Sequence, residues 1–157
     1  MRYSLAKVIV SVVLVVCYIF MPKYGFIDVH ELSECWYVHL LYPFSHANIW
    51  HLLANIVCLW MIPCELHLLI SFLLAVLCSI LPCFISEMTM GFSGVLFAIV
   101  GISWGQVHRF KNMIWKNKWF LVIPIFLPHV NAFIHLYCMI FGYLCGRYIP
   151  MKKGDWL

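Results

Sequence analysis

Long apolar runs alternate with short polar stretches along almost the whole chain. A membrane-crossing α-helix needs about 20 predominantly apolar residues, and most of these runs approach that length. Six segments are expected, at residues 4–21, 49–64, 68–85, 91–107, 119–128 and 132–149. The pattern predicts an all-α polytopic membrane protein with a bundle of six transmembrane helices.

The last two segments come from one apolar stretch, residues 119–149, which is too long for one span and short for two. The sequence PHVN at 128–131 favours a break because proline and asparagine are typical of turns. The fifth segment is then short and contains Pro124. Whether it crosses the bilayer fully is left open by the sequence.

The distribution of positive charge decides between five and six spans, because cytoplasmic loops carry an excess of lysine and arginine. Six spans with a cytoplasmic N-terminus place nine of the ten lysines and arginines inside, Lys23 being the exception. Five spans would move Arg147, Lys152 and Lys153 outside. Six spans with both termini in the cytoplasm are therefore expected, and the inside-positive bias fits a bacterial plasma membrane.

Composition supports an integral membrane protein. The chain has 157 residues, of which 65% are hydrophobic and 10% charged, whereas soluble domains carry roughly 25% charged residues. A core of this size cannot bury so much apolar surface, so lipid has to solvate part of it. We expect a single membrane-embedded domain, 1–157, with no extramembrane domain and an uncleaved first span. The net charge of +4 comes from the basic residues expected on the cytoplasmic side of the membrane. No nucleic-acid partner is therefore expected.

Polar residues recur at one depth within the apolar spans. His51 and Asn55 lie one helical turn apart near the start of the second span, Ser93 begins the fourth, and His135 lies one turn into the sixth. All three spans start on the outer side in this topology. Polar groups are costly in lipid and usually serve a function there, so these four residues are the candidate site.

Small residues predict which spans meet. One set lies within the fourth span and another within the sixth, each on a single helical face: Gly94, Ala98, Gly101 and Gly105, then Cys138, Gly142 and Gly146. Faces of small residues let membrane helices approach closely. If these two faces meet, Ser93 and His135 come together, and a serine within reach of a histidine is a nucleophile with its general base.

Simpler interpretations exist for each feature taken alone. A serine in a membrane helix can bond its own backbone, a histidine at a span end can be interfacial, and a glycine face can serve packing only. A metal site could gather four histidines, His46, His51, His129 and His135. Ligands on one helix face are three or four residues apart, whereas His46 and His51 are five apart, so no metal or other cofactor is expected. A channel or transporter would need polar residues through the full depth of the membrane.

Three motifs, in order and on the expected spans, resemble the rhomboid family of intramembrane serine proteases. GFSG at 91–94 resembles its GxSG motif, and HANIWHLLAN at 46–55 resembles its H-x4-H-x3-N signature. HLYCMIFG at 135–142 resembles its H-x2-G-x3-G pattern. The six-span count and the cytoplasmic N-terminus agree with the same family.

The resemblance implies a Ser-His dyad that cleaves transmembrane protein substrates within the bilayer. Ser93 would be the nucleophile and His135 its base, while His51 and Asn55 would form the oxyanion hole with the backbone N–H of the serine. The supporting residues of the site would be Gly91, Gly94 and Phe97, with the Phe97 ring packed on the catalytic imidazole. It also implies substrate entry between the second and fifth spans. The alternative is a non-catalytic rhomboid-like protein that binds transmembrane helices.

Two positions depart from the family pattern. Cys138 stands where the family usually has glycine, so the fourth and sixth spans are expected to lie slightly farther apart. Residues 22–47, between the first two spans, are expected to form a loop with interfacial character. In this loop Trp36 is followed by Tyr37, whereas many rhomboids have a Trp-Arg pair. The second departure bears on how the loop is anchored in the membrane interface rather than on the chemistry.

Overall fold

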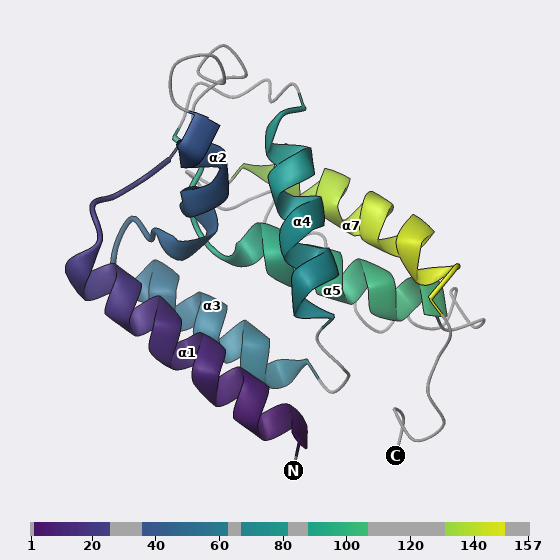
Figure 1. Cartoon of the computed structure of the whole chain (residues 1–157), viewed down its shortest axis with the longest axis horizontal. Coiled ribbons are helices and arrows are strands. Elements are labelled where there is room, and N and C mark those ends of the chain that lie inside the picture. The colour runs from purple at the N-terminus through teal and green to yellow at the C-terminus, as the bar shows by residue number, and fades with distance from the viewer. Residues whose placement is uncertain (1, 26–35, 63–66, 82–87, 107–130, 150–157) are drawn as a thin grey trace.

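The computed structural model describes residues 2–25, 36–62, 67–81, 88–106 and 131–149. Within these ranges the chain forms six α-helices and one 3-10 helix (Figure 1). They are α1 (Arg2–Phe20), α2 (Trp36–Leu41), η2 (Tyr42–Phe44), α3 (Ile49–Met61), α4 (Leu68–Ser79), α5 (Ser93–Gln106) and α7 (Ala132–Gly146). The helical content agrees with the all-α class that the apolar runs predict.

Five helices coincide with five of the expected segments. The helices α3, α4 and α7 begin at the residues where segments 49–64, 68–85 and 132–149 were expected to begin, and they end a few residues earlier. The segment 119–128 lies outside the described residues. In the described part of the chain, no helix combines the length and the apolar character needed to cross a membrane. The six spans and the orientation of the termini stay predictions.

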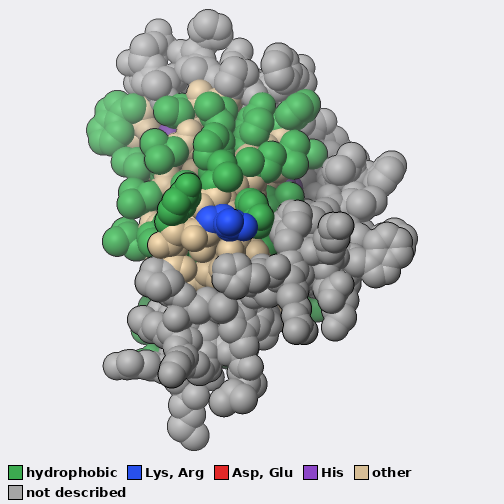
Figure 2. Space-filling model, turned by 90° about the vertical axis from the view of Figure 1, so that its right-hand side faces the viewer, with side chains coloured by type: hydrophobic (Ala, Val, Ile, Leu, Met, Phe, Trp, Pro, Cys, Tyr) green, Lys and Arg blue, Asp and Glu red, His purple; other side chains and the backbone are tan. Residues whose placement is uncertain are grey.

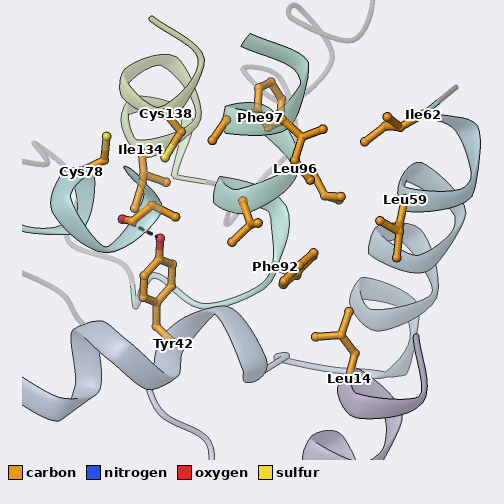
Figure 3. Packing of buried hydrophobic residues seen from close by; sticks show 14 of the residues in the cluster. Leu14, Tyr42, Leu59, Ile62, Cys78, Phe92, Leu96, Phe97, Ile134 and Cys138 are labelled. Carbon is orange, nitrogen blue, oxygen red and sulfur yellow. Dashed lines mark hydrogen bonds between the residues drawn. The ribbon is translucent and has the colours of Figure 1, made fainter. Parts of the chain in front are cut away.

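The connection between the first two long helices was expected to be a loop, and this expectation was wrong in part. It contains α2 and η2, and the Tyr42 side chain is only 1% exposed. The Tyr42 hydroxyl donates a hydrogen bond of 3.0 Å to the carbonyl oxygen of Ala75 in α4, drawn as the dashed line in Figure 3. A contact with a helix distant in sequence therefore helps to bury Tyr42, and no local periodicity signals it.

Helix α5 occupies the centre of the core. Val95, Ile99 and Ile102 have no exposed surface, and Phe92 and Leu96 face Leu14 and Leu59 from α1 and α3 in Figure 3. On its other side α5 packs along α7, which runs beside it in Figure 1. The serine at the start of α5 is thereby held within the bundle.

Glycines allow α5 and α7 to touch through their backbones. A Cβ atom on Gly101 would collide with the carbonyl oxygen of Met139, and one on Gly142 would lie 3.2 Å from the Cα of Ala98. The Cys138 sulfur fits beside Gly94, 3.5 Å from where a Cβ atom would lie on that glycine. The helices are thus in direct contact one turn beyond Cys138, whose sulfur packs beside Gly94; the slightly larger spacing relative to other rhomboids stays a prediction.

Polar contacts join α1 to α3. Lys7 is only 8% exposed, and its ammonium donates hydrogen bonds to the carbonyl oxygens of Trp60 and Ile62 at the end of α3. A positive charge at a helix C-terminus interacts favourably with the helix dipole and with unpaired carbonyls. The Trp60 indole donates to the Ser11 hydroxyl at 3.2 Å. These contacts fix the helix that carries His51 and Asn55 against α1.

Many large hydrophobic side chains lie on the surface of the described part of the chain. Figure 2 shows them covering much of the described part of one face. Along α7 the exposed ones include Leu136, Ile140, Phe141 and Leu144, each more than 40% exposed. Monomeric soluble proteins rarely expose large contiguous apolar patches.

Candidate active site

The GFSG turn places Ser93 at the first position of α5. Gly91 has a φ of +115°, a conformation that side chains with a Cβ atom rarely adopt. Its backbone N–H donates to the carbonyl oxygen of Tyr42 at 2.9 Å, which ties the turn to η2. The chain then enters the helix, with the first helical hydrogen bond running from the N–H of Leu96 to the carbonyl of Phe92.

Ser93 and His135 lie in hydrogen-bond contact. The distance between Ser93 Oγ and His135 Nε2 is 2.7 Å, across the junction between α5 and α7. His135 is 7% exposed, and its Nδ1 has no hydrogen-bond partner among the described residues. With the proton on Nδ1, Nε2 presents a lone pair and accepts from the serine hydroxyl. This is the geometry of a nucleophile and a general base.

The aromatic ring of Phe97 covers one face of the His135 imidazole. The two ring centroids are 4.4 Å apart and the planes differ by 9°, so the rings are stacked. Phe97 follows Ser93 by one helical turn, and both side chains therefore meet the same histidine. The stack restricts rotation of the imidazole away from the serine.

His51 and Asn55 converge on Gly91, two residues before Ser93. A Cβ atom on Gly91 would lie 2.7 Å from His51 Nε2 and 3.5 Å from Asn55 Nδ2. Asn48 caps α3 by accepting a 2.9 Å hydrogen bond from the N–H of His51. The Asn55 amide donates to the carbonyl oxygen of His51 at 3.1 Å. Because an asparagine amide has two N–H groups, a second donor can be directed toward the GFSG turn.

His46 lies behind His51 and outside the expected span 49–64. The two imidazoles meet edge to face, with centroids 5.2 Å apart and planes at 69°. Burial, and to a lesser extent the neighbouring His51, lower the pKa of His46 from 6.5 to about 4, against the raising effect of a hydrogen bond with the Phe44 backbone. His46 is therefore neutral at physiological pH and packs as an uncharged ring.

The site residues that the structure describes do not form a metal centre with one another. No group of three or more His, Cys, Asp or Glu side chains in that part of the chain is arranged to hold an ion. His129, the fourth member of the histidine set considered above, lies outside the described residues.

Sequence reasoning missed Tyr42. Its carbonyl holds Gly91 and its hydroxyl lies close to Gly94, 3.0 Å from where a Cβ atom on that glycine would be. The residue stands in a connection with no helical periodicity, so the local pattern gave no reason to link it to the GFSG turn. Its contacts join segments about fifty residues apart in sequence.

Comparison with known protein families identifies one family that matches the chain. The family model described as Rhomboid domain matches residues 33–151, well over half of the chain. The chain belongs to the rhomboid family. Rhomboids are integral membrane proteins and are generally intramembrane serine proteases. A search of curated proteins found no match to the chain.

The rhomboid match covers all of the candidate site. It extends from before α2 to beyond α7, and thus includes His51, Asn55, Ser93 and His135. Helix α1 precedes the matched range. Its contacts with α3, described above, attach it to the rhomboid region.

Proposed function

We propose that this rhomboid is a serine endopeptidase that hydrolyses peptide bonds in or next to transmembrane segments of membrane proteins. The observation that carries the proposal is the 2.7 Å contact between Ser93 Oγ and His135 Nε2. It joins the two residues that the family motifs assign to the chemistry. A non-catalytic rhomboid-like protein would have no need to keep both side chains in this contact.

In the proposed reaction His135 Nε2 takes the proton of the Ser93 hydroxyl while Oγ attacks the substrate carbonyl carbon. The resulting tetrahedral intermediate collapses to an acyl-enzyme, and the protonated imidazole gives its proton to the leaving amine. Water then attacks the ester carbonyl with His135 again acting as base, which releases the new carboxyl terminus and restores Ser93. No acidic residue takes part.

The oxyanion of the tetrahedral intermediate would be stabilised by the backbone N–H of Ser93, with His51 and Asn55 as side-chain donors. Support comes from the convergence of His51 Nε2 and Asn55 Nδ2 on Gly91, at the turn that leads to the nucleophile. The N-terminus of α5 adds a favourable dipole. Removing a single oxyanion donor typically lowers the rate by about 10²–10³-fold.

The proposed substrates are single membrane-spanning helices with a locally weak backbone. A membrane helix satisfies its backbone hydrogen bonds internally, so its carbonyl groups are inaccessible until the helix unwinds. Small or helix-breaking residues near the scissile bond would make unwinding easier. We further propose that both termini are cytoplasmic, that the site faces the outer side of a bacterial plasma membrane, and that no cofactor is used.

A reporter that carries one transmembrane segment, reconstituted with the protein in liposomes, tests the proposal. The parent should cleave it, while Ser93→Ala and His135→Ala should not, because the first lacks the nucleophile and the second lacks the base. A fluorophosphonate probe should label Ser93 in the parent and fail to label His135→Ala. Cleavage by either variant at the parental rate would refute the dyad, and reporter binding without turnover by the parent would favour the non-catalytic alternative.

A further inference from the structure

Asn131 begins the helix that carries the histidine. Its Oδ1 accepts hydrogen bonds from the backbone N–H groups of Phe133 and Ile134, at 3.1 Å and 3.2 Å. The first N–H groups of a helix have no partner within the helix, and an asparagine cap satisfies them. The cap uses only the oxygen of the amide, so the amide nitrogen is available to donate to another group.

The Nδ2 of Asn131 donates to the hydroxyl of Thr89 at 2.6 Å. Asn131 is 9% exposed and Thr89 is 6% exposed, so the bond is shielded from solvent. A buried polar group that loses its partner is costly, which favours the bonded arrangement. Both ends of the Asn131 amide are therefore engaged, and the amide has one defined orientation.

The two residues joined by this bond have the same sequence separation from the dyad. Thr89 precedes Ser93 by four residues, and Asn131 precedes His135 by four residues. The chain that enters α5 is thereby joined to the start of α7 by one hydrogen bond, and the helices are joined again at Ser93 and His135. The Thr89–Asn131 bond fixes the relative position of the two segments just before each carries its dyad residue.

We propose that Thr89 and Asn131 are positioning residues that hold Ser93 Oγ and His135 Nε2 at hydrogen-bond distance. The effect on catalysis rests on the proposed protease function, whereas the effect on the Ser-His contact does not. Small displacements between reacting groups have large effects, since a misplacement of about 1 Å can cost about 100-fold in rate. Neither residue touches the reacting atoms.

Two variants remove the Thr89–Asn131 hydrogen bond (the bridge) in different ways. Thr89→Val keeps the shape of the side chain and removes the hydroxyl. Asn131→Ser keeps an oxygen that can cap α7 but is too short to serve also as the donor to Thr89. Thr89→Ser retains the hydroxyl and serves as the conservative rescue. Ser103→Ala is the matched control, because it removes a buried hydroxyl of α5, ten residues after Ser93, that donates to the Ile99 carbonyl at 2.8 Å.

The first readout is the imidazole ¹⁵N spectrum of His135 in the full-length protein, which reports the hydrogen bond to Ser93 directly. Ser93→Ala defines the signal with the bond broken. The Nε2 signal of Thr89→Val and Asn131→Ser should move toward that value, while Thr89→Ser and Ser103→Ala should retain the parental signal. Parental signals in both bridge variants would overturn the inference, whether or not the protein cleaves any substrate.

The second readout is the rate at which a fluorophosphonate labels Ser93. Both bridge variants should label about tenfold more slowly, as expected for loss of one net hydrogen bond, and their KM for the reporter should stay near the parental value while kcat falls. A decrease in Ser103→Ala as large as in Thr89→Val would overturn the inference, because general loosening would then explain it. If the parent is neither labelled nor active, the protease proposal fails, and the ¹⁵N shifts still decide the role of the bridge.

Discussion

Phe97 and His135 lie face to face, with ring centroids 4.4 Å apart and nearly parallel planes. The stack contacts the imidazole on the flat side, whereas Ser93 contacts its edge at Nε2. An imidazole that is contacted both on its face and at its edge can adopt few other orientations. The same helix, α5, supplies the ring and the serine, so the geometry of the pair depends on how α5 lies against α7.

The first prediction concerns this stack. Phe97→Leu keeps an apolar side chain of similar reach and loses the flat face. Aromatic pairs contribute about 0.5–1.5 kcal/mol beyond area burial, so fluorophosphonate labelling of Ser93 should slow by roughly two- to tenfold. Phe72→Leu is the control, because it makes the same substitution in α4, where the Phe72 ring packs against Phe44 with centroids 5.7 Å apart. Equal labelling rates in the two variants would show that the stack does not orient His135.

The second prediction concerns Gly91. An alanine there would be strained by the φ of +115° and would collide with the His51 imidazole. Residues forced into such backbone regions cost on the order of 1–3 kcal/mol. Gly91→Ala should therefore lower the free energy of unfolding and abolish reporter cleavage. A variant that folds and cleaves at the parental rate would contradict the assigned positions of Gly91 and His51.

The third prediction concerns the contact between α5 and α7. A side chain at Gly142 would meet the backbone of Ala98, which cannot move aside as a flexible side chain can. Overpacking of this kind costs about 1–3 kcal/mol or more. Gly142→Val should lower the free energy of unfolding in detergent by at least this amount. Leu144→Ala, on the exposed side of the same helix, should change it by about 0.5 kcal/mol or less; similar losses in both variants would argue against the close approach.

The fourth prediction concerns pH and His46. Its pKa is about 4 in the folded protein and 6.5 as an ordinary histidine in the unfolded chain, so the unfolded chain binds more protons between these two values. Stability should then be complete above pH 6.5 and fall as the pH drops toward 4, by about 3 kcal/mol in total for this one group. The difference in unfolding free energy between pH 7 and pH 4.5 should be smaller in His46→Gln than in the parent. Equal differences would mean that His46 is not the group that titrates.

Local sequence patterns were sufficient to locate most of the helices. Apolar runs are a property of neighbouring residues, and the starts of α3, α4 and α7 follow from them. The small-residue faces also indicated that Ser93 and His135 would meet, because residues on one helical face act together. The fourth span was expected to begin at Gly91, whereas α5 begins at Ser93, because the positive φ of Gly91 is not a helical conformation and its N–H bonds to Tyr42.

Several features of the site depend on contacts between segments far apart in the chain. Three hydrogen bonds, from Tyr42 to Ala75, from Gly91 to Tyr42 and from Asn131 to Thr89, join residues about thirty to fifty positions apart. The sequence showed PHVN only as a break between two apolar segments. It could not reveal that the asparagine in this break caps α7 and reaches the turn before α5.

The sequence by itself determined the residue types of the site, the helices that carry them and the family to which they belong. These follow from composition, periodicity and short motifs, all of which are read along the chain. The tertiary structure alone decided that Phe97 stacks on His135, that His51 and Asn55 converge on Gly91, and that Thr89 meets Asn131. Such contacts depend on how whole helices pack, and packing is a property of side-chain shapes brought together from distant positions.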